Sequence, residues 1–216
     1  MEIKVMKNIM HSNNVIAAEN REYIKEKNIC AINVLASPGA GKTSLLVKLI
    51  EALRDRAPIA VIEGDIAGSI DAERIDKLEI PVVQINTCGG CHLDANMIRE
   101  ALISLEPVYE TIIFIENVGN LVCPSSFDLG ETLRIVISSV TEGSDKPIKY
   151  PQAFKTADLI ILNKIDLIEY TDFDRDYFYK GISSVNGKKI MEVSCVKNTG
   201  INELAEEIIN LSKSKR

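Results

Sequence analysis

Seven short apolar runs of strand length recur along the chain, and segments of helical character separate several of them. The runs cover residues 29–36, 57–63, 80–85, 111–116, 134–140, 158–163 and 189–195. Most are nearly continuous Val, Ile and Leu, a pattern typical of strands that are buried on both faces of a parallel sheet. Residues 42–55, 94–106 and 201–215 have helical periodicity. The order predicts an α/β fold with a mostly parallel central sheet of about seven strands and helices on both faces.

The 216 residues contain no internal repeat, low-complexity tract or Pro/Gly-rich linker, so we expect a single domain over 1–216. Residues 1–28 are predicted to form a helical extension that packs on this domain. Its apolar positions are Ile9, Val15, Ile16 and Ile24.

Charge and cysteine content narrow the classes of function. The net charge of −6 argues against non-specific binding to nucleic acid or anionic lipid. No apolar run reaches the roughly 18 residues that a membrane span requires. The odd count of five cysteines and the lack of an apolar signal segment favour a reducing, cytoplasmic location. Cys30 and Cys195 fall within predicted strands, where core thiols are expected.

The first apolar run leads directly into the glycine-rich segment ASPGAGKTSLL. It matches the phosphate-loop pattern G-x-x-x-x-G-K-[ST], with Ala36 at the first glycine. Backbone N–H groups of such a loop, and the N-terminus of the helix after it, bind phosphate oxygens. Lys42 would reach the β- and γ-phosphates, and the Thr43 hydroxyl would ligate Mg²⁺. The predicted nucleotide-binding residues are Pro38, Gly39, Ala40, Gly41, Lys42, Thr43 and Ser44.

An N-K-x-D tetrapeptide follows the sixth run, at Asn163, Lys164 and Asp166. The Asp166 carboxylate can accept hydrogen bonds from guanine N1–H and the exocyclic amino group, and adenine does not offer this pair. Asn163 would contact the base or brace the phosphate loop, while Lys164 would lie along the purine. A backbone N–H at Ser194 or Cys195 could contact guanine O6, although a plain polar loop explains that segment equally well. The predicted nucleotide is therefore GTP or GDP.

Acidic residues end the second and fourth runs. Asp65 could hold Mg²⁺ directly or through water, and Asp71 is a second candidate. Glu116 to Gly119 has the form of the D-x-x-G switch, with Glu in place of Asp. The Gly119 N–H would sense the γ-phosphate, and Glu116 would reach the Mg²⁺ shell or orient water. We assign catalytic roles to Lys42, Asp65, Glu116 and Gly119, with helix capping by the acids as the alternative.

Cys88, Cys91 and His92 follow the third run, and Cys123 follows the fourth. We expect these two strands to be adjacent, which would bring their loops together at the nucleotide edge of the sheet. Cys91, His92 and Cys123, with Cys88 as an optional fourth ligand, would form a sulfur–nitrogen site suited to Zn²⁺ or Ni²⁺. A Cys88–Cys91 redox pair, c-type haem attachment and simple core thiols remain alternatives.

Taken together, these segments resemble the HypB-type hydrogenase maturation factors, which are GTP-binding proteins of nickel incorporation. The matching segments are AAENREYI, SPGAGKTSLL, VIEGDIAGSIDAERI, CHLDANMI, FIENVGNLVCPSSFDLGE, SVTEGSDKPIKYP and NKIDL. The resemblance implies a slow P-loop GTPase that helps to deliver nickel to [NiFe]-hydrogenase. It also implies a GTP-bound homodimer with the metal site at its interface, and Lys146 and Lys149 near the partner's nucleotide. The implied partners are a small zinc-containing maturation protein and the hydrogenase large-subunit precursor.

Two features depart from that family's pattern. The start, MEIKVMKNIMHSNN, has only His11 and no cysteine, so we do not expect the second nickel site of some members. Cys88 stands where many members have glycine. The competing interpretations are a GTPase accessory factor for urease or a cobalamin-dependent mutase, a nickel or zinc storage module, and a small-molecule kinase. The kinase has no need of N-K-x-D.

Overall fold

The computed structural model describes residues 4–65, 75 and 77–215, with the side chains of residues 4–9 outside the description. A seven-stranded sheet has the order β3-β2-β4-β1-β5-β6-β7, and its neighbouring strands pair in parallel. The strands are β1 (Cys30–Ala36), β2 (Ile59–Asp65), β3 (Val82–Asn86), β4 (Ile112–Glu116), β5 (Leu133–Ser139), β6 (Leu159–Asn163) and β7 (Ile190–Glu192). The predicted parallel α/β sheet is therefore confirmed.

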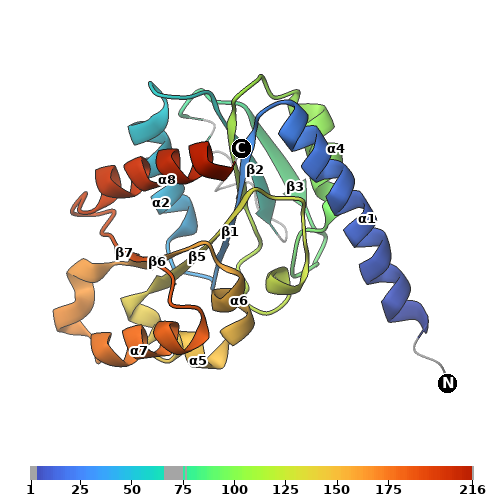
Figure 1. The fold of residues 1–216 in the computed structure, drawn as a ribbon. Helices are drawn as coiled ribbons and strands as arrows, with labels where there is room; N and C mark the ends of the chain where they lie inside the picture. Colours follow the sequence, from blue (N-terminus) through green and yellow to red (C-terminus); the bar gives the residue numbers. More distant parts are fainter. Residues whose placement is uncertain (1–3, 66–74, 76, 216) are drawn as a thin grey trace.

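Helices cover both faces of the sheet (Figure 1). They are α1 (Lys4–Glu26), α2 (Lys42–Leu53), α4 (Ala95–Leu105), α5 (Lys146–Lys149), α6 (Pro151–Thr156), α7 (Arg175–Val185) and α8 (Ile201–Lys215). Short 3-10 turns occur at η1 (Pro124–Ser126), η2 (Val140–Glu142) and η3 (Ile165–Tyr170). No helix among the described residues is both long and apolar enough to cross a membrane.

The alternation of side chains along β1 explains how the layers pack. Cys30, Ile32 and Val34 face a core shared with α2 and α8, which confirms Cys30 as a core thiol. On the other face, Ala31 packs in a core with α4 and Leu35 in a core with α6 and α7. Asn33 lies between these two positions and is fully buried. The second face is thus divided into two apolar cores by a polar side chain.

Three expectations about local structure are wrong. The third and fourth strands are not adjacent, because β2 lies between β3 and β4. The seventh strand is shorter than its apolar run and ends at Glu192, so Cys195 lies in the following turn and is only half-buried. In α1, Val15 is 48% exposed, whereas Ile24 is buried as expected. Among the side chains of α1 that the structure describes, the buried ones are Asn13, Ala17, Asn20 and Ile24, and that of Ile9 lies outside the description.

A candidate nucleotide and metal site at the carboxyl ends of the strands

The phosphate loop joins β1 to α2 and is braced from β6. The Asn163 side-chain N–H donates to the carbonyl oxygen of Ala40 over 2.9 Å. Gly41 has φ +94°, and a Cβ at this position would lie 2.6 Å from Asn163 Nδ2. Glycine is therefore needed at Gly41 for both its backbone conformation and the close approach of Asn163. The bracing role predicted for Asn163 is present in the structure.

The rest of the N-K-x-D segment also contacts this loop or its surroundings. Lys164 adopts φ +60°, and its Nζ donates to the carbonyl oxygen of Gly39 over 2.7 Å. The Ser194 hydroxyl donates to the Asp166 carboxylate, which orients Asp166 beside the loop that follows β7. The Ser194 N–H donates to the Thr199 carbonyl oxygen over 3.0 Å. This N–H is consequently engaged within the loop, and a contact of the Cys195 N–H with guanine O6 stays a prediction.

Cys195 lies next to this arrangement, half-buried at the edge of the core shared with α2 and α8. Its Sγ is 3.7 Å from Asn163 Oδ1. Burial is the main cause that raises the pKa of Cys195 above that of an ordinary thiol. The protonated thiol can therefore donate to Asn163 and help to hold the amide that braces the phosphate loop.

The predicted magnesium residues gather at the ends of β2 and β4. The Thr43 hydroxyl, in the first turn of α2, donates to Glu116 Oε1 over 2.8 Å, and both side chains are buried. Asp65 is the last residue of β2, and Asp71 lies outside the described residues. A hydroxyl and carboxylates are oxygen donors of the kind that Mg²⁺ prefers, so this donor set fits the ion.

The switch glycine lies directly against the phosphate loop. A Cβ on Gly119 would lie 3.2 Å from Pro38 Cγ and 3.3 Å from Pro38 Cα. At the neighbouring residue of the loop, Lys146 Nζ is 3.5 Å from Ser37 Oγ, and it is 3.4 Å from Glu142 Oε1. Lys149, one turn further on, is exposed and pairs with Asp145. Lys42 and Ser44 are half-buried at the start of α2, where the pattern predicts them.

The predicted soft metal ligands form a cluster close to the switch. One ligand atom each from Cys91, His92 and Cys123 can be chosen so that all three lie within 4.8 Å of one another. The His92 ring stacks on Phe127 with ring centroids 3.8 Å apart. Cys88 is exposed, has φ +50° and is not part of the cluster. The structure thus supports a three-residue site and not the four-ligand variant.

The two ligand loops meet although β2 separates their strands. Leu93 lies over Gly64 of β2, where a Cβ would be 2.7 Å from Leu93 Cδ1. The absence of a side chain at Gly64 lets the segment after β3 cross the end of β2. The crossing segment is then held from β4, because the Leu93 N–H donates to Asn117 Oδ1 over 3.1 Å.

The surroundings of the cluster shift the pKa values of two of its residues, Cys91 and His92. The hydrogen bond with Cys123, followed by desolvation, raises the pKa of Cys91 above that of an ordinary thiol. Desolvation lowers the pKa of His92, although Asp94 opposes this effect. His92 is therefore a neutral imidazole near pH 7, whereas Cys91 loses a proton when metal binds. One imidazole and two sulfurs fit Zn²⁺ or Ni²⁺ and leave at least one coordination position open.

A buried polar chain joins the switch to both loops of candidate metal ligands, and the sequence patterns did not predict it. Asn117 Nδ2 donates to Asn33 Oδ1 over 3.1 Å, and Asn33 Nδ2 donates to Glu131 Oε1 over 3.3 Å. Arg134 pairs with Glu131 and donates to the carbonyl oxygens of Ser125 and Phe127. Two sequence features could have indicated this polar chain: Asn33 lies within the first apolar run, and Arg134 lies at the start of the fifth.

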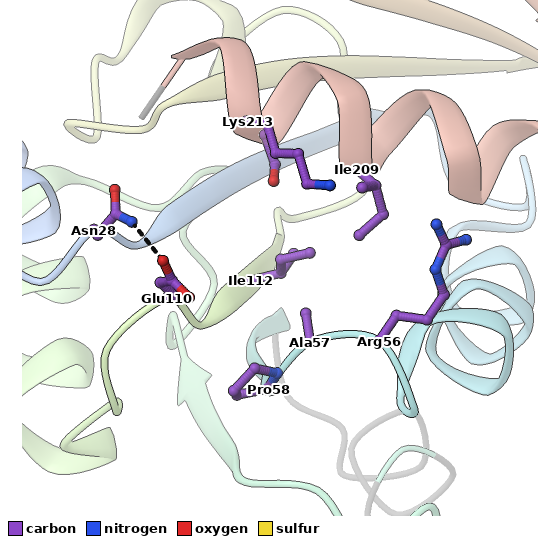
Figure 2. Close-up of a pocket in the computed structure, with 9 residues that line it drawn as sticks. Asn28, Arg56, Ala57, Pro58, Glu110, Ile112, Ile209 and Lys213 are labelled. Carbon is purple, nitrogen blue, oxygen red and sulfur yellow. Dashed lines mark hydrogen bonds between the residues drawn. The ribbon is translucent and has the colours of Figure 1, made fainter.

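A separate cavity of about 460 Å³ lies at the amino ends of the strands, beside α8 (Figure 2). Asn28 donates to Glu110 at one side of it, and Lys213 of α8 borders it. The Arg56 guanidinium makes two hydrogen bonds to Glu206, at 2.7 and 2.9 Å. None of the predicted site residues lines this cavity.

Comparisons with known proteins agree with the geometry. A family model described as CobW/HypB/UreG, nucleotide-binding domain, matches residues 30–192. Hydrogenase maturation factor HypB of Rhizobium leguminosarum bv. viciae is 50% identical over 184 residues, which are 85% of this chain and 62% of that protein. The chain therefore spans less than two thirds of that relative.

Two solved structures are similar over nearly their whole length. The crystal structure of hydrogenase maturation factor HypB from Archaeoglobus fulgidus has a TM-score of 0.87 at 35% identity. The match covers 94% of this chain and 99% of that one. The crystal structure of HypB from Helicobacter pylori in complex with nickel has a TM-score of 0.89 at 33% identity, with coverages of 94% and 96%.

Proposed function

Because this chain belongs to the CobW/HypB/UreG family and, within it, to the HypB group, we propose that it is a GTP-dependent nickel-delivery factor. In this proposal it binds GTP, hydrolyses it slowly to GDP and phosphate, and helps to insert nickel into [NiFe]-hydrogenase. One observation carries the proposal: the segment with Cys91 and His92 is hydrogen-bonded through Leu93 to Asn117, inside the switch. The proposed metal and nucleotide sites would therefore share a structural element.

The nucleotide half of the proposal is supported by the braced phosphate loop. Gly41 and the N-terminus of α2 would receive the phosphates, and Lys42 would neutralise charge on the β- and γ-phosphates. Asp166, oriented by Ser194, would select guanine. Bound Mg²⁺ would neutralise further charge on the phosphates. Thr43, Glu116 and Asp65 would hold that ion, directly or through water.

Slow turnover is part of the proposal and follows from the position of Glu116. This side chain is 3% exposed and its Oε1 accepts the hydrogen bond from Thr43. A carboxylate that is buried and already engaged is poorly placed to activate a water molecule. Gly119 would sense the γ-phosphate, because its backbone packs against Pro38 of the phosphate loop.

The metal half is supported by the ligand cluster and by the nickel complex of the Helicobacter pylori relative. Cys91, His92 and Cys123 would bind Ni²⁺ as cargo, with Zn²⁺ as a competitor. Three ligands leave an open position that a second copy could fill across a two-fold axis. Val122, next to Cys123, is 58% exposed and would be covered in such a GTP-bound homodimer.

The remaining partners follow from the family. A small zinc-containing maturation protein would receive or supply the metal, and the hydrogenase large-subunit precursor would be its destination. Both protein–protein interactions are proposed to take place in the cytoplasm. A metal storage module is the competing function. Loss of hydrogenase maturation in a Lys42→Ala variant that still binds nickel would exclude storage as the main role.

The test is a titration of Ni²⁺ and Zn²⁺ into the protein with GDP and then with a nonhydrolysable GTP analogue. Thiolate-to-metal absorption reports binding, and molecular mass reports dimerisation. We expect nickel affinity to differ between the two nucleotides by about 5- to 150-fold, the usual range of allosteric coupling. Cys91→Ala and Cys123→Ala should abolish the signal, whereas the matched variant Cys88→Ala should keep it. Identical nickel affinities and dimer fractions in both nucleotide states would refute the coupled mechanism.

A further inference from the structure

We propose that Asn13 and Asn20 of α1 are positioning residues for the metal site. They hold the loop that follows His92 at a fixed distance from the loop that follows Cys123. The inference rests on the proposed function, since it concerns the same metal cluster. It assigns a role to α1, including Asn20 of the AAENREYI segment, which the nucleotide and metal chemistry do not use directly.

Asn13 bridges the two ligand loops with the two ends of one amide. Its Oδ1 accepts from the N–H of Ala95 over 2.9 Å, and its Nδ2 donates to the carbonyl oxygen of Asp128 over 2.8 Å. Ala95 lies just beyond His92, and Asp128 lies just beyond Phe127, on which His92 stacks. Asn13 is only 7% exposed. The distance between these backbone positions is therefore set by the length of a single side chain.

Asn20 makes a second bridge two turns further along the same helix face. Its Nδ2 donates to the carbonyl oxygens of Ala95 and Leu129, at 2.8 and 3.0 Å. Asn20 is 2% exposed. Asn13 and Asn20 thus engage both the N–H and the carbonyl of Ala95. The peptide groups on either side of Ala95 are thereby tied to α1 and, through it, to the loop that follows Cys123.

The loop after Cys123 approaches α1 too closely for ordinary side-chain packing. A Cβ on Gly130, which has φ +84°, would lie 2.5 Å from the carbonyl oxygen of Ala17 and 2.7 Å from Asn20 Cβ. Arg21 adds two hydrogen bonds to the Asp128 carboxylate, at 2.8 and 3.0 Å. This contact is held by backbone proximity and by paired polar groups, which leaves little room for the loop to slide.

A simpler explanation is that the two asparagines only dock α1 on the protein. Docking alone would be served as well by apolar residues, since buried amides must be fully hydrogen-bonded to avoid a net cost. Ile24 and Tyr23 already anchor the helix in the apolar core that includes α4. Satisfied buried polar groups add directional constraints that apolar contacts lack. Two such groups that both span the ligand loops indicate a geometric role.

The test compares Asn13→Ala, Asn13→Asp and Asn20→Ala with Asn14→Ala. Asn14 is exposed on the same helix, so its variant is a matched control. Asn13→Asp keeps the acceptor for Ala95 N–H and removes the donor to Asp128, so it breaks the bridge at one end. A Ni²⁺ titration measures the metal site, and the affinity for a fluorescent GDP analogue measures the nucleotide site.

A second measurement, made without metal, reports on the distance between the two ligand loops. In a Cys88→Ser background, diamide accepts two electrons and two protons from the Cys91 and Cys123 thiols, which form a disulfide while diamide becomes the hydrazine. Peptide mapping identifies the bond and its rate of formation. Because the two thiols are neighbours in the cluster, the wild-type arrangement should cross-link readily.

We expect each Asn13 and Asn20 variant to weaken nickel binding at least about 5-fold, to alter the thiolate-to-nickel spectrum and to slow cross-linking at least about 3-fold. GDP affinity should stay within about 2-fold, and Asn14→Ala should match wild type. Unchanged nickel binding and cross-linking, or a parallel loss of GDP affinity, would overturn the positioning role. If wild-type protein binds no nickel yet the variants still cross-link slowly, the proposed function fails while the positioning role stands.

Discussion

The backbone N–H of Leu93 donates to Oδ1 of Asn117 over 3.1 Å, which joins the loop of the candidate metal ligands Cys91 and His92 to the candidate switch. The same Oδ1 accepts the N–H of Val118 over 3.0 Å, so one amide oxygen holds both segments. Asn117 is fully buried. A shift of the switch on loss of the γ-phosphate would therefore move Leu93, and with it the neighbouring Cys91 and His92.

Replacing Asn117 should make the affinity for nickel independent of whether GDP or a GTP analogue is bound. Asn117→Ala leaves the Leu93 N–H without this acceptor and should lower the free energy of unfolding by about 1–3 kcal/mol. We expect the ratio of nickel affinities in GDP and GTP-analogue states to fall close to one. Asn186→Ala is the control, because the Asn186 amide also binds backbone groups, donating to the carbonyl oxygens of Phe154 and Ala157, but it is far from the switch in the chain. A ratio that stays at the wild-type value would place the coupling elsewhere.

Gly64 of β2 is predicted to be essential for the metal site although it binds nothing. In Gly64→Ala the new methyl group would meet Leu93 at 2.7 Å and push the crossing segment away from β2. Overpacking of this kind typically costs about 1–3 kcal/mol of stability. We expect weaker nickel binding with little change in GTP binding, measured by parallel titrations. Adding Leu93→Ala should restore part of the nickel affinity, and a strictly additive double variant would argue against this contact.

Two glycines of the phosphate loop offer an internal comparison. Gly41 and Gly39 both have positive φ, but only at Gly41 would a Cβ meet a neighbour, Asn163 Nδ2 at 2.6 Å. Gly39→Ala would add backbone strain of about 1–2 kcal/mol, whereas Gly41→Ala would also displace the bracing amide. We expect the loss of GDP affinity to be at least about tenfold larger for Gly41→Ala, measured by equilibrium binding. Equal losses would mean that strain alone governs this loop.

The nucleotide side of the molecule could be predicted from sequence because its determinants are local. A phosphate loop follows its strand directly, and N-K-x-D ends another strand, so position along the chain nearly defines position in space. The bracing contact from Asn163 to Ala40 is the structural counterpart of that pattern. At these residues, the family resemblance implies the same roles as the motifs themselves.

The arrangement around the metal site was harder to predict, because it depends on strand order. The meeting of Cys91 and Cys123 was expected from adjacent strands, yet β2 intervenes and the loops meet through Gly64 and Leu93. Apolar periodicity selected Val15 for the buried face of α1, whereas Asn13 and Asn20 occupy that face. Buried polar side chains are invisible to a search for apolar spacing, since their burial depends on partners from distant segments.

The ion pair of Asp128 and Arg21 predicts a specific dependence of stability on pH. Burial opposes ionisation of Asp128, but hydrogen bonds from the Gly130 N–H and from Arg21, together with the charges of Arg21 and Arg134, outweigh it and lower the pKa of Asp128. A carboxylate with a depressed pKa in the folded state stabilises the protein above its unfolded pKa, about 3.9, and this contribution is lost as the pH falls through the folded pKa.

Asp128→Asn should therefore be less stable than wild type at pH 7, by about 0.5–1 kcal/mol because the pair is partly exposed. The difference should shrink as the pH falls below about 4, because the unfolded chain then takes up a proton at Asp128, and the folded protein does so only at its lower pKa. Urea unfolding of both proteins between pH 7 and pH 3 measures it. The Arg21→Ala variant should show the same convergence at low pH. A difference that persists unchanged at pH 3 would mean that Asp128 acts through shape and hydrogen bonding alone, without its charge.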